Sequence, residues 1–174
     1  RGMVRKRCRR DRGLRGYSHL KAIPEASRWL GEEAGLFADR LSINLERPTG
    51  ASRTRLAPEK SGATIETAMG RIGERISQAR AEKRRFSPAG QSTQVIVGAD
   101  ATDDSAMIAK SAMLYGSYGL SRVYYSAFSP IPDASVTLPP QAPPLKREHR
   151  LYQADWMLRY YKFTAPEVAA ATDG

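Results

Sequence analysis

The stretch that decides the fold is QSTQVIVGADATDD, from Gln91 to Asp104. A polar lead-in is followed by a short β-branched run, the run ends at Gly98, and an acidic segment then begins a helical pattern. Thr102 is the expected N-cap of that helix, and Gly119 suits the position just after its end. This order of features predicts a strand joined by a tight turn to a helix.

The same arrangement occurs four times along the 174 residues. We expect strands at 17–23, 39–46, 92–98 and 121–128, and helices at 26–37, 63–85, 103–118 and 146–162. Strands that alternate with helices indicate βαβ units and a parallel sheet, so the predicted class is α/β. Polar residues at the C-terminal ends of all four strands favour part of a barrel over a small open sheet. We expect one barrel region over 1–163, followed by a tail over 164–174.

The chain is basic, with a formal net charge of +10. Much of that excess lies in the arginine-rich start, RGMVRKRCRRDRGLR, which could neutralise phosphates of a nucleic acid or form a solvated helix end. Within this stretch, Met3, Val4 and Cys8 followed by Gly13 have the pattern of the end of an earlier helix. We therefore expect a fragment that a further unit precedes, with the first and last strands exposing unpaired edges.

Several classes of protein are excluded by simple absences. No apolar run approaches the roughly 20 residues of a membrane span, so we expect no membrane partner. The single cysteine, Cys8, excludes an internal disulfide framework and suits a reducing cytoplasm. It also excludes a cysteine-only metal or iron–sulfur site made by this chain alone. Neither phosphate-loop pattern, no G-x-S-x-G and no H-E-x-x-H occurs.

Polar pairs near the strand ends are the candidate site. Residues two apart on a strand share a face, which groups His19 with Lys21, Asn44 with Glu46, Gln94 with Ile96, and Tyr124 with Ser126, and leaves Tyr125 on the other face. Together they describe a polar mouth, with a Lys–Glu pair, that could bind hydroxyls and charges. Each residue alone also has a structural explanation: a satisfied histidine, an ion pair, or tyrosines that pack with a hydrogen-bonded tip.

Six segments resemble one family in order and with matching gaps: GYSHLKAIPEAS, DRLSINLERPT, RLAPEKS, FSPAGQSTQVIVGA, RVYYSAFSPIP and REHRLYQADWMLRYYKF. The family consists of radical S-adenosylmethionine (SAM) proteins named for DNA modification or repair and related to biotin synthase. The resemblance implies a partial (β/α)6 barrel of the TIM type, of which this chain would supply the third to sixth strands. It also implies SAM and a [4Fe–4S] cluster as cofactors of the full-length protein.

The resemblance assigns roles to individual positions. Cofactor contacts would come from Asn44, Glu46, Ile96 and Gly98, with the glycine letting the backbone approach adenine. The candidates for the substrate side are His19, Lys21, Tyr124, Tyr125 and Ser126. Related enzymes often carry a glutamate near Ala101, which is absent here, and Asp103 could replace it one turn on. The cluster cysteines would lie in the earlier strands, so no metal ligand and no catalytic residue is assigned to this chain.

Three functions remain open at this stage. The first is part of a radical SAM enzyme that acts on nucleic acid, with the missing N-terminal strands of its own chain as partner. The second is a non-catalytic basic α/β module that binds nucleic acid. The third is a radical SAM enzyme with a small-molecule substrate, which would bind SAM but show no salt-dependent affinity for DNA.

Overall fold

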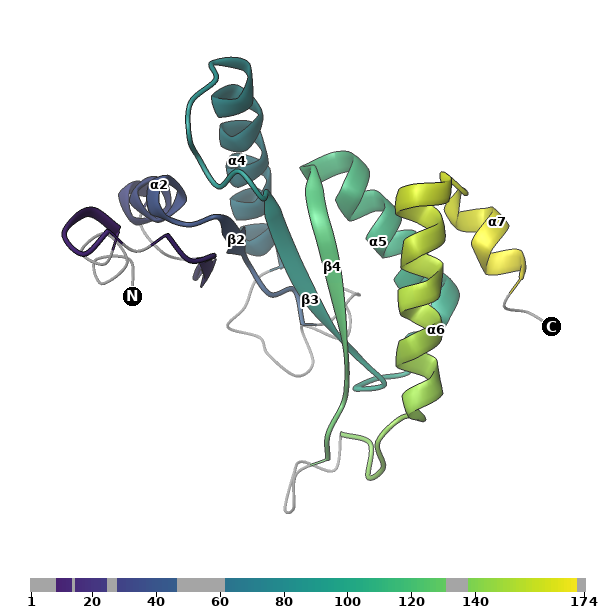
Figure 1. Ribbon diagram of the computed structural model, residues 1–174. Helices are drawn as coiled ribbons and strands as arrows, with labels where there is room; N and C mark the ends of the chain where they lie inside the picture. Colours follow the sequence, from purple (N-terminus) through teal and green to yellow (C-terminus); the bar gives the residue numbers. More distant parts are fainter. Residues whose placement is uncertain (1–8, 14, 25–27, 47–61, 131–137, 172–174) are drawn as a thin grey trace.

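The computed structural model describes residues 9–13, 15–24, 28–46, 62–130 and 138–171. One parallel sheet runs through this part of the chain in the order β1-β2-β3-β4 (Figure 1). Its strands are β1 (His19–Lys21), β2 (Arg40–Ser42), β3 (Gln91–Val97) and β4 (Leu120–Ala127). The predicted α/β class with an all-parallel sheet is therefore confirmed.

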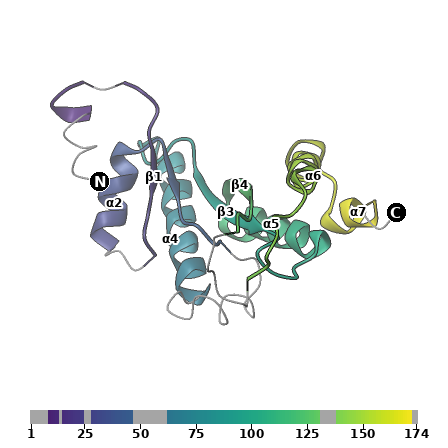
Figure 2. The ribbon, with the colours of Figure 1, turned by 90° about the horizontal axis from the view of Figure 1, so that it is seen from below.

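Helices follow the strands along the chain. They are α2 (Arg28–Phe37), α4 (Gly62–Ala81), α5 (Asp104–Tyr118), α6 (Leu145–Trp156), the π-helical turn η1 (Met157–Tyr161) and α7 (Ala165–Ala170). In Figure 2, β1 and α2 lie at one end of the molecule and α7 at the other. The Met3–Cys8 part of the expected early helix lies outside the described residues.

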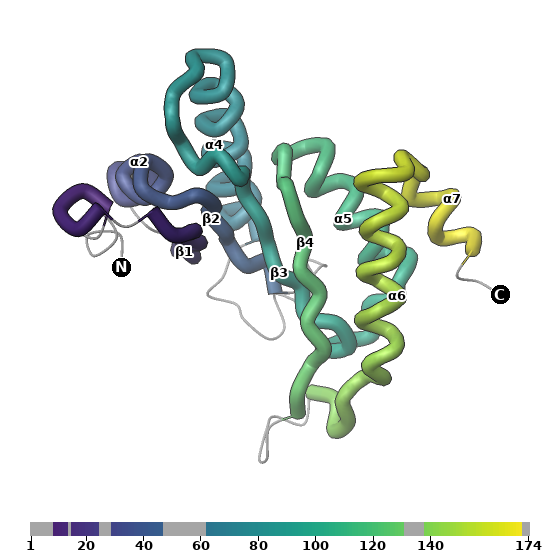
Figure 3. The backbone as a smooth tube through the Cα atoms, in the orientation of Figure 1, coloured from purple at the N-terminus to yellow at the C-terminus, as the bar shows by residue number. Residues whose placement is uncertain are grey.

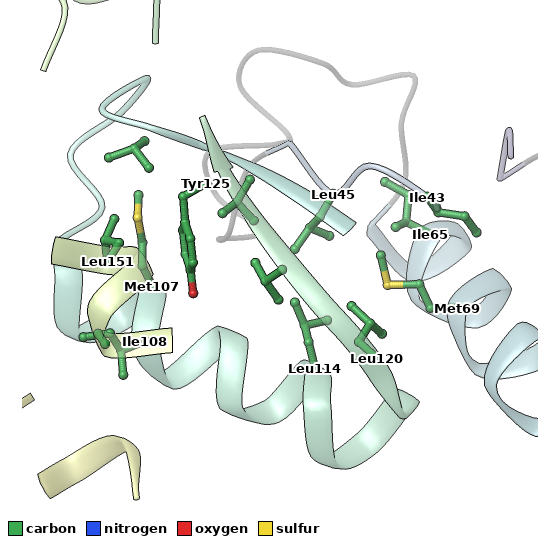
Figure 4. Close-up of a cluster of buried hydrophobic side chains, with 14 of the residues drawn as sticks. Ile43, Leu45, Ile65, Met69, Met107, Ile108, Leu114, Leu120, Tyr125 and Leu151 are labelled. Atoms are coloured by element: carbon green, nitrogen blue, oxygen red, sulfur yellow. The ribbon is translucent and has the colours of Figure 1, made fainter. Parts of the chain in front are cut away.

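One face of the sheet is buried under helices. Ile43 and Leu45 share a buried cluster with Ile65 and Met69 of α4 (Figure 4). Val95, Val97 and Tyr125 extend the same cluster, with Met107 and Ile108 of α5 and Leu151 of α6. In the other half, Leu41 packs with Ile76, Phe86 and Ala34, the last of which belongs to α2. Because Leu41, Ile43 and Leu45 alternate along the chain, α2 and α4 cover the same face.

The outer edge of β4 is closed by side chains. The N–H of Val123 donates to Tyr115 Oη at 2.9 Å, that of Tyr125 to Tyr152 Oη at 3.0 Å, and that of Ala127 to Glu148 Oε2 at 2.8 Å. The expectation that the last strand exposes an unpaired edge is wrong. A row of phenol and carboxylate oxygens from α5 and α6 supplies the acceptors that another strand would otherwise supply.

β2 is shorter than expected because a side chain interrupts its ladder. The Thr93 hydroxyl donates to Ile43 O at 2.7 Å and accepts from Leu45 N at 3.0 Å, in place of backbone groups. Pairing resumes at Glu46, whose N–H donates to Gln94 O at 2.8 Å and whose carbonyl accepts from Ile96 N at 2.6 Å. The chain thus stays beside β3 through residue 46 (Figure 3), although the strand ends at Ser42.

α4 ends at Ala81, four residues before the predicted boundary. Lys83 has a φ of 54°, and the N–H groups of Lys83 and Arg84 donate back to Arg80 O and Ala79 O. This closes the last carbonyls of the helix in the manner of a left-handed C-terminal motif. Arg85, which follows this turn, pairs with Asp39 at 2.7 Å. The pair connects the segment after α4 to the start of β2.

The cap of α5 falls one residue after the predicted position. Asp103, not Thr102, is the N-cap, because its carboxylate accepts from Ala106 N at 2.7 Å. Gly119 ends the helix with a φ of 60°, as the sequence predicts. The backbone N–H of Thr102 donates instead to the side chain of Asp100, at 2.9 Å.

The C-terminal region holds more structure than expected. The helix predicted over 146–162 is α-helical to Trp156 and then continues as one π turn, η1, which ends at Lys162 with a φ of 64°. The predicted tail contains α7, where the Glu167 carboxylate accepts from both the N–H and the hydroxyl of Thr164 at 2.7 Å. Val168 then anchors α7 in the core.

Candidate functional site

The sheet face opposite the helices is polar. By strand alternation, side chains that do not enter the core point to this other face. We define the open face by these residues, of which Ile96 is the apolar member: His19, Lys21, Arg40, Ser42, Asn44, Ser92, Gln94, Ile96, Arg122, Tyr124 and Ser126. It draws on all four strands of the sheet. All-parallel sheets normally have both faces covered, so a polar face that no described helix covers is a candidate binding surface.

Side-chain contacts connect the open face from strand to strand. Asn44 Nδ2 donates to Gln94 Oε1 at 3.5 Å, which joins the segment after β2 to β3. The Nη1 of Arg40 donates to the Tyr124 hydroxyl at 3.1 Å, which joins β2 to β4 across β3. His19 Nε2 lies 3.5 Å from Ser92 Oγ. These three contacts are separate pairs on one face of the sheet, and each joins two different strands or the segment after a strand.

Two guanidinium groups give the open face a positive character. Arg40 spans the middle of the sheet, and Arg122 stacks over the Tyr124 ring at 5.3 Å and the Tyr152 ring at 5.7 Å. The Arg122 Nε is buried and meets no hydrogen-bond acceptor among the described residues. Burial and then the charge of Arg40 lower the pKa of His19, which keeps its imidazole neutral at neutral pH. Such a face suits a ligand with a carboxylate or phosphate group.

The residues expected to contact SAM have different surroundings. Asn44 lies in the open face, close to Gln94. Glu46 follows at the rim, in the left-handed region with a φ of 62°, and its backbone is fixed by both neighbours on β3. The N–H of Ile96 is one of those two groups, so it is already used within the sheet.

Gly98 has a structural reason to be glycine. Its φ is 76°, and a Cβ there would lie 2.7 Å from Pro143 in the loop before α6. The close neighbour of this glycine is therefore the chain's own proline ring. The left-handed φ and the contact with Pro143 account for the residue without a ligand.

The acidic turn that follows Gly98 is committed to structure. Asp100 and Asp103 accept from the backbone of the turn and of α5, and Asp104 pairs with Arg147 Nε at 2.7 Å. Arg147 also donates to Thr102 O at 2.7 Å, so that it clamps the start of α5 to α6. Asp103 serves as the helix cap, which is a different role from the predicted replacement of a glutamate near Ala101.

The substrate-side candidates divide between the two faces. His19, Tyr124 and Ser126 lie on the open face, and Lys21 is exposed two residues beyond His19 on β1. Tyr125 does not join them. It is 2% exposed, its hydroxyl lies 2.7 Å from Ser111 Oγ, and its ring packs edge-on against Tyr152 at 5.2 Å. Burial raises the pKa of Tyr125, which keeps the phenol protonated in the core.

Sequence reasoning missed four residues of the open face, Arg40, Ser42, Ser92 and Arg122, and the two arginines among them carry its guanidinium charges. The signal was present, because Arg40 and Ser42 precede Asn44, Ser92 precedes Gln94 and Arg122 precedes Tyr124 at the two-residue spacing of one strand face. Extending the alternation back toward the start of each strand would have found them.

A cavity of about 350 Å³ lies elsewhere, between β1, α2 and α4. Its lining is mainly apolar and includes Leu20, Ile72 and Phe86, and Lys21 is the one predicted site residue that borders it. The cavity therefore belongs to the helix side of the sheet and is distinct from the open face.

No group of three or more histidine, cysteine, aspartate or glutamate side chains is arranged to hold a metal ion in the described ranges. Cys8 lies outside them. Nor does any helix in the described part of the chain combine the length and the apolar character that a membrane crossing requires.

Comparisons with protein-family models, with curated proteins and with solved structures gave no match.

Proposed function

We propose that these residues form the C-terminal part of a radical SAM barrel, in which the open face is the inner wall that holds SAM and faces a substrate. The observation that carries this proposal is the group of polar side chains, several of them paired across strands, on a sheet face that α2, α4 and α5 leave free. The family resemblance supplies the identity of the cofactor. We also propose a cytoplasmic location, because a chain with a single cysteine suits a reducing compartment.

The strand order supports a barrel over a doubly wound sheet. In doubly wound folds the order of the strands across the sheet reverses at a switch point, and helices cover both faces of the sheet. Here the order is sequential, β1 to β4, and the core residues of α2, α4 and α5 meet one face. Successive parallel strands with helices outside generate the curved wall of a (β/α) barrel, whose inner face carries the functional residues.

The open face fits SAM in chemical kind. The amides of Asn44 and Gln94 can donate and accept toward ribose hydroxyls, and Glu46 lies beside them at the rim. The guanidinium groups of Arg40 and Arg122 suit the carboxylate of the methionine part. In such enzymes the bound cofactor supplies a radical that removes hydrogen from a substrate, and the wall residues bind and orient.

The iron–sulfur cluster does not fit this chain alone. Its ligands are cysteine thiolates, and the sequence holds one cysteine, Cys8. The proposal therefore requires the cluster cysteines in an N-terminal part of the barrel. The reading frame upstream of Arg1 should encode a C-x3-C-x2-C motif, and its absence from the intact gene would contradict the proposal.

The longer protein provides the chemical test. After anaerobic reconstitution with iron and sulfide, it should turn brown and release 5′-deoxyadenosine from SAM when a reductant is added. Asn44→Ala should weaken SAM binding, measured by calorimetry, by about five-fold or more for the loss of a polar contact. Arg84→Ala, at an exposed side chain in the turn after α4, is the control and should bind like the parent protein. Equal affinities in both variants would remove Asn44 from the SAM site.

A further inference from the structure

The outward face of α6 and η1 carries cationic, polar and aromatic side chains and no acid. We define the α6 strip by residues that recur at helical spacing and are all exposed: Lys146, His149, Arg150, Gln153, Trp156 and Tyr160. By the rise of an α-helix the strip is about 20 Å long. Trp156 is 50% exposed and Tyr160 57% exposed, which is unusual for such large rings.

Both acids of this segment are turned inward. Glu148 accepts from the N–H of Ala127 at the edge of β4, and Asp155 is 1% exposed. Asp155 accepts from the Tyr115 hydroxyl and from two nitrogens of Arg159, at 2.8 and 2.6 Å. Consequently no carboxylate on α6 or η1 offsets the charges of Lys146 and Arg150 on the outward face.

The two rings form a prepared stacking platform. The Trp156 and Tyr160 centroids are 4.5 Å apart, with 38° between the ring planes. The guanidinium of Arg159 lies 4.8 Å from the Tyr160 centroid while its nitrogens stay bound to buried Asp155. A chain of contacts from the core thus holds the exposed rings in place, which lowers the entropy that a ligand must overcome to use them.

We infer that the α6 strip binds single-stranded nucleic acid, with bases stacked on Trp156 and Tyr160 and phosphates beside Lys146 and Arg150. Exposed aromatic rings with interleaved cations are the usual means of holding single strands, because every base offers a π-face. A duplex hides those faces, so it would use the cations alone. Protein interfaces are also rich in tryptophan, tyrosine and arginine, so a protein partner is the alternative that the variants below must separate from a single strand.

The helix that carries the strip lies beside the open face. Arg122 of the open face stacks on Tyr152 of α6, and α6 packs along β4 (Figure 1). The inference names a substrate class for the barrel proposed above, on which its biological meaning rests. The binding itself is measured without SAM, so that failure of the strip and failure of the SAM site are separate results.

The test is fluorescence anisotropy of a labelled oligothymidylate with the full chain, in parallel with a duplex of equal length. The single strand should bind more tightly than the duplex, and its affinity should fall as salt rises. In a Trp29→Phe background, Trp156 is the one remaining tryptophan, and stacking should quench its emission on addition of the single strand.

Variants separate stacking from charge. Trp156→Ala should weaken single-strand binding by about five-fold or more, the loss of one base stack, with little change in duplex binding. Lys146→Ala combined with Arg150→Ala should flatten the salt dependence by about 0.7 in slope for each phosphate that is no longer neutralised. Trp29→Ala is the matched control, because Trp29 is 64% exposed on α2 at the other end of the molecule.

Two results would overturn the inference. One is equal single-strand affinity for Trp156→Ala and Trp29→Ala, with circular dichroism showing both folded. The other is a parent protein whose dimeric mass, measured by light scattering, becomes monomeric in Trp156→Ala, because the rings would then serve contact between copies. Retained strand binding with lost SAM binding would instead count against the proposed function alone.

Discussion

The two ends of the sheet differ in how their edges are finished. At the β4 end, strands of seven and eight residues pair along their length, and the outer edge gives its N–H groups to Tyr115, Tyr152 and Glu148. At the β1 end, the strands have three residues each, and no further strand of the described residues pairs with β1. An edge closed by side chains excludes another strand, whereas an open edge is a place where one can add.

The buried core follows the same division, although large exposed apolar side chains occur at both ends. Five lie on α2 and the segments beside it, and five lie on α6, η1 and just after them: Tyr17, Ile23, Trp29, Leu30 and Leu36, and Leu145, Trp156, Tyr160, Tyr161 and Phe163. Near β4, the core reaches through α5 and α6 to Val168 of α7. Similar βα units can therefore differ in how much of their hydrophobic face is buried, because that face is buried only where a neighbouring element covers it. We expect the β4 half to carry most of the stability.

Asp155→Ala should have the largest effect, because it breaks the β4 half at its buried charge. The change leaves Arg159 and the Tyr115 hydroxyl without their shared acceptor. Removal of one partner of a buried ion pair typically costs about 3–5 kcal/mol. Urea unfolding should show this loss, and the exposed Asp11→Ala variant should unfold like the parent. A loss below about 1 kcal/mol would contradict the proposed asymmetry between the two ends.

Asp39→Asn tests the β1 half. The Asp39 carboxylate accepts from the N–H and hydroxyl of Ser18, from Arg85 at 2.7 Å and from Arg9, so it joins three segments. We expect a loss of about 1.5–3 kcal/mol at neutral pH, the usual value for hydrogen bonds to a charged group.

The pH dependence of that loss has a definite sign. Burial alone would raise the pKa of Asp39, but the hydrogen bonds from Arg85 and Ser18 and the charge of Arg9 outweigh it and hold the pKa below 3.8. The stabilisation is therefore complete above the ordinary aspartate pKa and disappears as pH falls through the lowered one. Parent and Asp39→Asn should converge in urea midpoint in strong acid. A gap that stays constant with pH would show that the charge of Asp39 is not responsible.

Tyr152→Phe should act on the closed edge alone. The variant keeps the ring that packs on Tyr125 but removes the hydroxyl that serves the N–H and C=O of Tyr125. A buried group left unsatisfied costs about 1–3 kcal/mol, and the Tyr125 amide should exchange its hydrogen faster. Tyr161→Phe, on a ring that is 67% exposed, is the control. Unchanged exchange at Tyr125 would mean that other contacts close this edge.

Asp103→Ala should have the smallest effect, about 1 kcal/mol, the usual cost of an N-cap. Its acceptor bond to Ala106 is local and exposed. Thr102→Ala is the matched control, because the structure uses the backbone and not the side chain of Thr102 in this turn. If thermal unfolding showed Thr102→Ala to be the more destabilising change, the cap would belong to Thr102.

Much of the fold was accessible from the sequence because it rests on local pattern. The β-branched and aromatic runs before Gly98 and after Gly119 predicted β3 and β4 within about a residue, and alternation predicted that Tyr124 and Tyr125 lie on opposite faces. Thr164 and Glu167 have the spacing of a capping box, which indicates the start of a helix, although this signal was not used to predict α7.

What the sequence by itself determined was the order of strands and helices and the face on which most side chains lie, because both follow from periods of two and 3.6 residues. Only the tertiary structure decided the rest. The Thr93 hydroxyl replaces backbone groups beside β2, and the Tyr115 and Tyr152 hydroxyls accept hydrogen bonds from the outer edge of β4. Asp155 is buried, whereas Trp156 is exposed. These outcomes join residues far apart in the chain, and no local period encodes which distant group will reach a given backbone N–H.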